Sequence, residues 1–178
     1  MAKKCIFVLG GARSGKSHFA QELAGKLGRK VVFIATGEAH DEEMQARIDL
    51  HKKARPGSWR TLEIPAGIGR RLGEIGDAEV VIIDCLTLLV SNLLGDSTDY
   101  PEVEKQVLAE IGELVAGMDQ LDADFIIVSN EVGLGLVPET RVGRFYRDIL
   151  GRAHQLIARR ADGVYLMVAG MPLKVKGD

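Results

Sequence analysis

Short, continuously apolar runs alternate along this chain with longer stretches in which apolar residues recur at helical spacing. A run of about 4–8 apolar residues is typical of a strand buried on both faces, and recurrence every three or four residues is typical of a helix with one buried side. The runs predict strands at residues 5–9, 31–36, 59–64, 80–83, 125–128, 164–168 and 173–176. The spacing predicts helices at residues 16–27, 42–53, 69–75, 86–94, 103–118 and 141–160.

This alternation predicts an α/β fold. Strands that are apolar on both faces belong to a mostly parallel sheet flanked by helices on both sides, which makes three layers. The chain has 178 residues and contains no internal repeat, linker or low-complexity segment. Since domains most often contain about 100–200 residues, we expect a single domain over residues 1–178.

Composition and charge exclude several classes of protein. Hydrophobic residues make up 46% of the chain and charged residues 27%, which is typical of a globular protein rather than a disordered one. The net charge of −2 argues against a nucleic-acid-binding protein that works through bulk electrostatics. Any attraction for phosphate must therefore be local.

The apolar runs and the cysteines bear on location. No run approaches the ~20 residues that a membrane-spanning helix needs, and the first run is shorter than the ~7–15 residues of a signal-peptide core. Cys5 and Cys85 lie in or beside apolar runs and show no metal-type spacing. We therefore expect small buried thiols in a reducing compartment, and a cytoplasmic protein that does not span a membrane.

The clearest functional motif spans residues 10–17 and reads GGARSGKS. It fits the phosphate-binding pattern G-x-x-x-x-G-K-[ST], with a predicted strand before it and a predicted helix after it. Glycines in such a loop allow backbone N–H groups to surround phosphate oxygens, and the helix N-terminus adds partial positive charge. We expect Lys16 to contact the β- and γ-phosphates of ATP or GTP, and the Ser17 hydroxyl to bind Mg²⁺. The predicted loop consists of Gly10, Gly11, Ala12, Arg13, Ser14, Gly15, Lys16 and Ser17.

Asp84 follows the apolar run at residues 80–83. A carboxylate at the end of such a strand is the usual second partner of the magnesium ion in this class of site, directly or through water. The alternative is that Asp84 only caps the helix that follows.

One of the four histidines stands apart. His18, His40 and His154 look incidental, whereas His51 lies close in sequence to the cations Arg47, Lys52, Lys53, Arg55 and Arg60. Nearby cations disfavour protonation, so the imidazole would keep a nucleophilic nitrogen, and the same cations could hold phosphates during its attack on phosphorus. The alternative is a solvated basic end of a helix, which the helix dipole favours.

Four segments together are closely similar to one known family. They are GGARSGKS at residues 10–17, R-I-x-x-H at 47–51, RP-x-x-WRT-x-E at 55–63 and VSNEVGLGLVPETRVGRFYRDILGR at 128–152. The sequence thereby resembles, nearly end to end, the bifunctional adenosylcobinamide kinases/adenosylcobinamide-phosphate guanylyltransferases. The resemblance implies a P-loop fold of the RecA-like type, a homotrimer, and two reactions of cobalamin nucleotide-loop assembly.

In the first implied reaction, ATP or GTP phosphorylates the aminopropanol hydroxyl of the corrinoid adenosylcobinamide. In the second, GTP donates GMP to that phosphate through a GMP–histidine intermediate, which gives adenosylcobinamide-GDP and pyrophosphate. The family's guanylylated histidine matches His51, and the family's GTP phosphate site matches residues 10–17. Further family positions that contact the nucleotide or metal match Thr36, Gly37, Lys52, Lys53, Ala54, Arg55, Glu63 and Asp84.

Some assignments stay open at this point. Relatives can have glutamate where Asp84 stands, which leaves direct or water-mediated metal contact undecided. Asn130 and Glu131, with residues 138–141, either line the corrinoid side or form a turn in which Thr140 caps the long helix. A regulatory GTPase is disfavoured because N-K-x-D, and D-x-x-G after a strand, are absent. An ATP-driven motor is disfavoured by the small size, whereas a single-function small-molecule kinase remains an alternative.

Overall fold

The computed structural model describes residues 3–38, 42–53 and 55–177, and of residues 43, 44, 47 and 51 it describes only the backbone. A seven-stranded sheet runs through the molecule in the order β3-β2-β4-β5-β1-β6-β7. Every neighbouring pair is parallel except β6 and β7, which are antiparallel. The strands are β1 Cys5–Gly10, β2 Val31–Ala35, β3 Arg60–Glu63, β4 Val80–Asp84, β5 Asp124–Asn130, β6 Gly163–Val168 and β7 Met171–Lys176.

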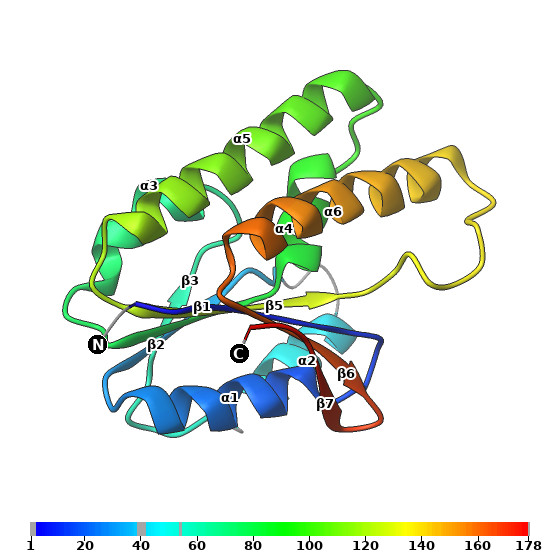
Figure 1. Cartoon of the computed structure of the whole chain (residues 1–178). Helices are drawn as coiled ribbons and strands as arrows, with labels where there is room; N and C mark the ends of the chain where they lie inside the picture. The colour runs from blue at the N-terminus through cyan, green and yellow to red at the C-terminus, as the bar shows by residue number, and fades with distance from the viewer. Residues whose placement is uncertain (1–2, 39–41, 54, 178) are drawn as a thin grey trace.

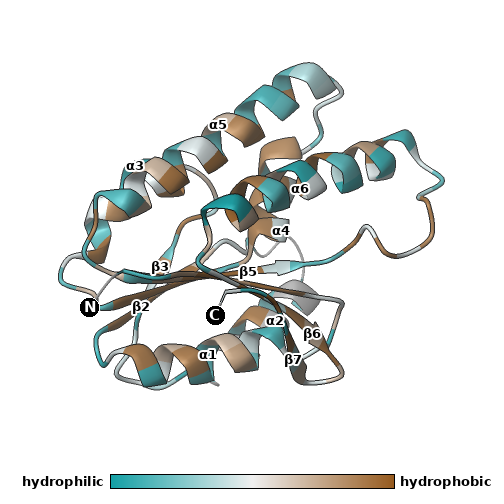
Figure 2. Ribbon diagram, in the orientation of Figure 1, coloured by the Kyte–Doolittle hydropathy of each residue, from teal (hydrophilic) through white to brown (hydrophobic). Residues whose placement is uncertain are grey.

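Helices cover both faces of this sheet (Figure 1). On one face lie α1 (Lys16–Leu27) and α2 (Glu42–Lys53), and on the other lie α3 (Ile68–Arg71), α4 (Leu86–Leu94), α5 (Tyr100–Asp119) and α6 (Arg141–Arg160). A short 3-10 turn, η1 (Leu72–Ile75), continues α3. Figure 2 shows the reason for this layering, because the central strands are mostly hydrophobic while the helices turn hydrophilic faces outward.

The core is accordingly divided by the sheet into two clusters. The larger cluster packs the inner faces of α3 to α6 against one face of the strands, and the smaller packs α1 against the other. Consecutive residues of a strand point to opposite faces, so they belong to different clusters. In β5, for example, Phe125 and Ile127 belong to the larger cluster, whereas Ile126 and Val128 belong to the smaller one.

The predicted α/β fold with a mostly parallel sheet is confirmed, and Cys5 and Cys85 are buried as expected. The last strand differs from a purely parallel sheet. Only Ala169 and Gly170 separate β6 from β7, and both have positive φ, 50° and 82°. A two-residue turn of that kind reverses the chain at once, so β7 must pair antiparallel with β6.

Two predicted helices differ from the observed ones in ways that the pattern of apolar residues does not indicate. One begins earlier than predicted, and the other consists of two short segments. The helix predicted from residue 103 begins at Tyr100, because the Asp99 side chain accepts a hydrogen bond from the backbone N–H of Glu102 at 3.2 Å. That contact is a helix cap, which hydrophobic spacing does not reveal. The helix predicted at residues 69–75 consists of the four-residue α3 followed by the 3-10 turn.

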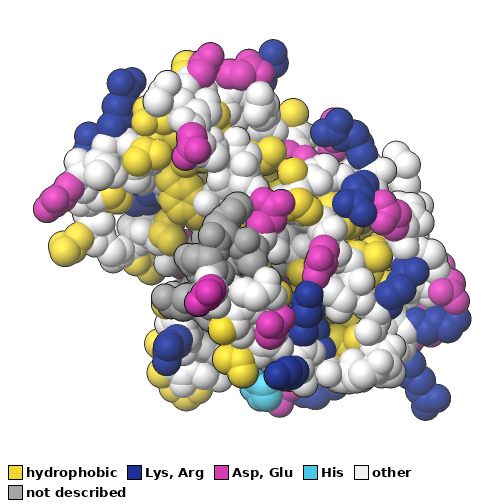
Figure 3. All heavy atoms as spheres, turned by 180° about the vertical axis from the view of Figure 1, so that it is seen from behind, with side chains coloured by type: hydrophobic (Ala, Val, Ile, Leu, Met, Phe, Trp, Pro, Cys, Tyr) yellow, Lys and Arg dark blue, Asp and Glu magenta, His cyan; other side chains and the backbone are white. Residues whose placement is uncertain are grey.

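The surface carries mixed charge. On the face seen in Figure 3, lysine and arginine side chains are interspersed with aspartate and glutamate, in keeping with a net charge of −2. Within the described part of the chain, no helix combines the length and the apolar character that crossing a bilayer requires.

Candidate functional site

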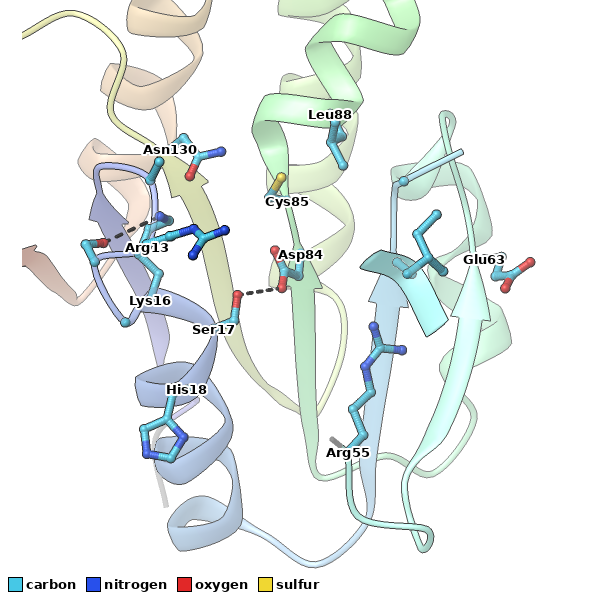
Figure 4. A pocket seen from close by; sticks show the side chains of 16 residues that line it. Arg13, Lys16, Ser17, His18, Arg55, Glu63, Asp84, Cys85, Leu88 and Asn130 are labelled. Carbon is cyan, nitrogen blue, oxygen red and sulfur yellow. Dashed lines mark hydrogen bonds between the residues drawn. The ribbon is translucent and has the colours of Figure 1, made fainter. Parts of the chain in front are cut away.

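A cavity of about 530 Å³ opens at the carboxyl ends of the central strands. Residues 12–17 form one wall, Asp84 and Cys85 lie at its base, and Arg55 and Glu63 line the opposite side (Figure 4). In parallel α/β sheets, the crevice beyond the carboxyl ends of the strands is where ligands bind. The segment that the sequence identified as a phosphate loop is therefore placed at the expected edge of the sheet.

The loop owes its shape to two glycines. Gly15 precedes the first residue of α1 with φ 94°, a conformation that side chains with a Cβ disfavour. A Cβ on Gly10 would lie 2.5 Å from Ser14 Oγ and 2.9 Å from the carbonyl oxygen of Met167. The loop is also tied to neighbouring strands, since the backbone N–H of Glu131 donates to the Gly10 carbonyl at 2.9 Å.

Lys16 is held inside the loop. Its ammonium donates to the Gly11 carbonyl at 2.6 Å and lies 3.5 Å from Ser14 Oγ, and only 8% of the residue is exposed. Burial lowers the pKa of Lys16, and the negative charge of Asp84 opposes that shift. The protein thus carries a partly desolvated cation that an anionic ligand would stabilise.

Ser17 and Asp84 come together, although 67 residues separate them in the sequence. The Ser17 hydroxyl donates to Asp84 Oδ2 at 3.0 Å (Figure 4). Thr36 fixes the backbone of Cys85, the residue after Asp84. Its hydroxyl accepts from the backbone N–H of Cys85 at 2.8 Å and donates to the Cys85 carbonyl at 2.7 Å. The Asp84 carboxylate therefore faces the phosphate loop.

The pair of Ser17 and Asp84 fits a magnesium ion. Both side chains offer oxygen atoms, which Mg²⁺ prefers, and they already lie within one hydrogen bond of each other. Among the described residues, no group of three or more His, Cys, Asp or Glu side chains could hold a metal ion without help. Magnesium usually keeps several waters and takes its remaining ligands from substrate phosphates, so two protein oxygens are sufficient.

Arg55 is the main cation on the opposite wall. Its guanidinium lies 3.5 Å from the centre of the Phe33 ring, and Nη1 donates to Thr61 Oγ1 at 3.3 Å. Burial lowers the pKa of Arg55, and the carboxylates of Asp84 and Glu63 oppose that shift. Its Nε is buried and has no hydrogen-bond partner among the described residues. Arg55 lines the cavity, and its guanidinium has more N–H groups than these contacts use.

Of the remaining predicted contact residues, some line the cavity and others do not. Gly37 lines the cavity, whereas Thr36 is fully buried and uses its hydroxyl on Cys85. Lys52 is paired with Glu63 at 2.5 Å on the surface, and the exposed Lys53 does not line the cavity.

His51 and its neighbours can be placed only in part. The backbone of His51 belongs to α2, but its side chain, that of Arg47 and the whole of Ala54 lie outside the described residues. Ile48, which precedes His51 by three residues in the same helix, lines the cavity. Arg60, which the sequence groups with the cations near His51, donates instead to the Glu74 carbonyl at 2.6 Å.

Sequence reasoning missed the environment of His154. This side chain looks incidental in the sequence, but it is 7% exposed and its Nε2 lies 2.7 Å from Ser129 Oγ. Burial lowers its pKa to about 4, against a raising effect of the Glu131 carboxylate. The helical spacing of α6 contained the signal, since position 154 shares a face with the buried residues Leu150 and Ile157. Thr140 does cap α6, by accepting from the Gly143 N–H at 3.1 Å.

Comparison with solved structures bears on the fold. The chain superposes with a TM-score of 0.59 on a Pyrococcus horikoshii OT3 protein at 10% identity, covering 98% of this chain and 86% of that one. It superposes on the RadB recombinase with a TM-score of 0.50 at 13% identity, covering 92% and 73%. These similarities place the chain among RecA-like P-loop folds and carry no further argument about function.

Comparison of sequences is more specific. The chain is 42% identical over 180 residues to the bifunctional adenosylcobalamin biosynthesis protein CobU of Escherichia coli (strain K12), covering 96% of this chain and 99% of the relative. It is 42% identical over 173 residues to the bifunctional adenosylcobalamin biosynthesis protein CobP of Pseudomonas aeruginosa, covering 96% of both chains. Residues 6–175 match the family model for cobinamide kinase / cobinamide phosphate guanyltransferase. The chain is therefore an enzyme that belongs to the cobinamide kinase / cobinamide phosphate guanyltransferase family.

Proposed function

We propose that this chain catalyses two reactions of cobalamin nucleotide-loop assembly in a single catalytic domain spanning residues 1–178. The first step phosphorylates adenosylcobinamide with ATP or GTP, and the second transfers GMP from GTP to the resulting phosphate. The observation that carries the proposal is the convergence of Lys16, Ser17 and Asp84 on one side of a cavity whose other side holds Arg55. Such a cavity offers cations for both ends of a triphosphate.

In the phosphoryl transfer, the aminopropanol hydroxyl attacks the γ-phosphorus of the bound triphosphate. A new P–O bond forms as the bond to the β-phosphate oxygen breaks, and the nucleoside diphosphate leaves while the hydroxyl proton passes to water. The loop of residues 10–17 holds the phosphates, and Lys16 stabilises the negative charge that spreads over them in the transition state. Mg²⁺ bound at Ser17 and Asp84 would neutralise charge on the β- and γ-oxygens.

In the guanylyl transfer, a neutral imidazole nitrogen of His51 attacks the α-phosphorus of GTP. A P–N bond forms, the bond to the β-phosphate oxygen breaks, and pyrophosphate leaves. A phosphate oxygen of adenosylcobinamide phosphate then attacks the same phosphorus, so that adenosylcobinamide-GDP forms and His51 is free again. Arg55 supplies positive charge on this side of the cavity, where the α-phosphate must lie for His51 to reach it.

Covalent labelling tests the proposal. The purified protein is incubated with Mg²⁺ and GTP labelled at the α-phosphate, and pyrophosphate release is measured in parallel. We expect a label on the chain that is lost in acid and stable in alkali, because protonation makes imidazole a good leaving group. Peptide mapping should place the label on His51, and GTP labelled at the γ-phosphate should leave no label.

A matched variant removes the remaining ambiguity. His51→Ala should take up no label but should still phosphorylate adenosylcobinamide, since direct phosphoryl transfer needs no covalent relay. A label that survives acid, or no label in a preparation with active kinase, would favour a single-function small-molecule kinase instead.

We further propose that the enzyme is a cytoplasmic homotrimer. Both cysteines are free and buried, which suits a reducing compartment. Leu134, Leu136 and Val137 are 83%, 96% and 64% exposed, and large exposed apolar side chains often mark subunit contacts. Sedimentation equilibrium would decide the oligomeric state, and a monomer at every protein concentration would contradict the proposal.

A further inference from the structure

The carboxyl end of β5 reaches the phosphate loop. Asn130, its last residue, pairs in register with Gly10, the last residue of β1, and the next backbone N–H, that of Glu131, donates to the Gly10 carbonyl. Asn130 also lines the cavity beside the loop, near Arg13 (Figure 4). An amide side chain is therefore presented to the ligand by a strand that is fixed to the start of the loop.

The two residues at this strand end point to opposite faces of the sheet. Strand alternation continues the pattern of β5, so Ser129 faces α4 and α6, whereas Asn130 faces α1 and the cavity. Contacts behind the sheet can therefore fix the position of a side chain in front of it.

Behind the sheet, Thr87, Ser129 and His154 form a buried chain of hydrogen bonds. The backbone N–H of Asn130 donates to Thr87 Oγ1 at 2.8 Å, Thr87 Oγ1 lies 3.1 Å from Ser129 Oγ, and Ser129 Oγ lies 2.7 Å from His154 Nε2. All three side chains are at most 9% exposed. The chain of hydrogen bonds thus starts on the backbone of Asn130 and ends on a histidine of α6.

The protonation state of His154 gives these hydrogen bonds one direction. Burial lowers the pKa of His154 to about 4, so the ring is neutral near pH 7 and has one nitrogen that accepts. Nδ1 lies 3.8 Å from the Glu131 carboxylate, which favours placing the ring proton there. Nε2 then accepts from Ser129, Ser129 accepts from Thr87, and Thr87 accepts from the Asn130 N–H. Every donor in the series has an acceptor.

The same atoms resemble a hydrolytic triad of serine, histidine and carboxylate, but they cannot act as one. Ser129 is completely buried beneath α4 and α6, so no substrate can reach its hydroxyl. A nucleophile must come within about 3–3.5 Å of the reacting atom. The arrangement therefore supports the position of a neighbouring residue instead of attacking a substrate.

The place of Asn130 relative to Lys16 indicates which phosphate it meets. The Lys16 ammonium, the group that contacts the β- and γ-phosphates in such loops, lies 2.6 Å from the Gly11 carbonyl. Asn130 is paired with the adjacent residue, Gly10, and so lies at the same end of the loop.

We propose that Asn130 is a catalytic residue of the phosphoryl transfer, whose amide N–H groups contact the transferred γ-phosphoryl group, and that Thr87, Ser129 and His154 are positioning residues that hold it there. This assignment rests on the proposed kinase function. In this assignment His154 affects the reaction through the position of Asn130, although His154 itself touches no substrate.

Steady-state kinetics of the kinase reaction test the assignment. Asn130→Ala should lower kcat on the order of 10²-fold, the usual loss for one donor that acts in the transition state, with little change in the KM for the nucleotide. Self-guanylylation should stay near the wild-type rate, because that attack occurs at the α-phosphorus. His154→Phe keeps the ring but removes the acceptor for Ser129, and should lower kcat in the folded protein, while His154→Gln should restore part of it.

A double-mutant cycle separates positioning from plain destabilisation. If His154 acts through Asn130, the variant with both Asn130→Ala and His154→Phe should be no slower than Asn130→Ala alone. Ile157→Val, on the same buried face of α6, should lower the free energy of unfolding without lowering kcat. Combined with Asn130→Ala, it should leave kcat at the value of Asn130→Ala alone, and the two changes in unfolding free energy should add.

The outcomes are distinguishable. An active wild-type kinase with unchanged kcat in Asn130→Ala would overturn this inference alone, and so would additive losses in the cycle. A wild-type protein that phosphorylates no corrinoid, although it binds nucleotide, would overturn the proposed function and this inference with it.

Discussion

The two walls of the cavity are built differently. The phosphate loop connects β1 to α1 in the middle of the sheet, and its side chains are held by hydrogen bonds to the loop itself and to β4. The opposite wall consists of α2, Arg55 in the segment after it, and the edge strand β3, which has only four residues, all exposed or half-buried. In α2, Leu50 is 66% exposed, and Ile48 is the only half-buried residue among the described side chains.

This difference suggests a division of labour between the walls. Phosphoryl transfer depends on positioning and on electrostatic stabilisation, which fixed strand ends in a packed core provide well. A covalent nucleophile can be added on a peripheral helix, because its own bond to the substrate supplies the positioning. Substitutions on the α2 wall should therefore impair guanylyl transfer selectively, whereas substitutions in residues 10–17, which hold the triphosphate in both proposed reactions, should impair both.

The largest expected effect is that of His51→Ala. Removal of a covalent nucleophile typically costs on the order of 10⁴–10⁶-fold in rate, and the loss should be confined to guanylyl transfer. Separate assays of GMP incorporation and of corrinoid phosphorylation would measure the split. Asp49→Ala, an exposed position on the same helix, serves as the control and should keep both activities. A joint loss in His51→Ala with GTP affinity intact would break the division between the walls.

Lys16→Ala should impair both reactions, because in the proposed mechanism both begin from a triphosphate held by the loop. Loss of one electrostatic contact in the transition state costs on the order of 10²–10³-fold, which corresponds to about 3–4 kcal/mol. Since burial disfavours the charged form of Lys16, its removal should not destabilise the folded protein. Thermal unfolding monitored beside the kinetics would verify this point. Lys26→Ala, an exposed position later in α1, should behave as wild type, and a Lys16→Ala protein of normal rate would remove the phosphate-loop argument.

The loop wall is also the more predictable one from sequence. A phosphate loop is a local motif, so the amino-acid sequence alone is sufficient to assign residues 10–17 and the strand and helix around them. The runs that form β4 and β5 are identifiable because strands buried on both faces are continuously apolar. The contact between Ser17 and Asp84 follows from placing both at the carboxyl edge of one sheet.

Other features depend on tertiary contacts that no local pattern contains. The spacing of α6 signals that position 154 is buried, but the bond from His154 to Ser129 joins positions 25 residues apart in different elements. The contact of Arg60 with the Glu74 carbonyl likewise depends on where η1 packs, which sequence proximity does not reveal. Asn130 is recognisable as polar at a strand end, but its support by Thr87 depends on the register of β5 against α4.

An effect of intermediate size is the pH dependence of stability that the buried His154 causes. His154 has a pKa of about 4 in the folded protein because it is buried, whereas an unfolded histidine titrates near 6.5. Between these pH values the unfolded chain binds more protons than the folded chain, so the free energy of unfolding falls as the pH is lowered. The expected slope is about 1.4 kcal/mol per pH unit, or about 3 kcal/mol over the whole interval.

Urea unfolding of the wild type and of His154→Gln from pH 7 to pH 4 would measure this contribution. Carboxylates other than Glu131, which lies beside the His154 ring, contribute equally to both proteins, so the difference between the two curves reports the histidine and its interaction with Glu131. The free energy of unfolding of the wild type, measured relative to that of His154→Gln, should fall steadily from about pH 6.5 to pH 4. Parallel curves would contradict a buried neutral His154.

The smallest effect is expected for the ion pair of Lys52 and Glu63 on the α2 wall. The two side chains are 40% and 63% exposed, and pairs as exposed as this contribute only about 0–1 kcal/mol because water and salt screen them. Lys52→Ala, Glu63→Gln and the double variant, compared by thermal unfolding at low and high salt, should give a coupling free energy within that range.

If Lys52 instead turns to the GTP phosphates, as its place beside His51 suggests, Lys52→Ala should raise the KM for GTP in guanylyl transfer while the unfolding temperature barely moves. A coupling of several kcal/mol, or a stability loss that matches the kinetic loss, would mean that the α2 wall is as firmly built as the phosphate loop, and the contrast between the two walls would no longer hold.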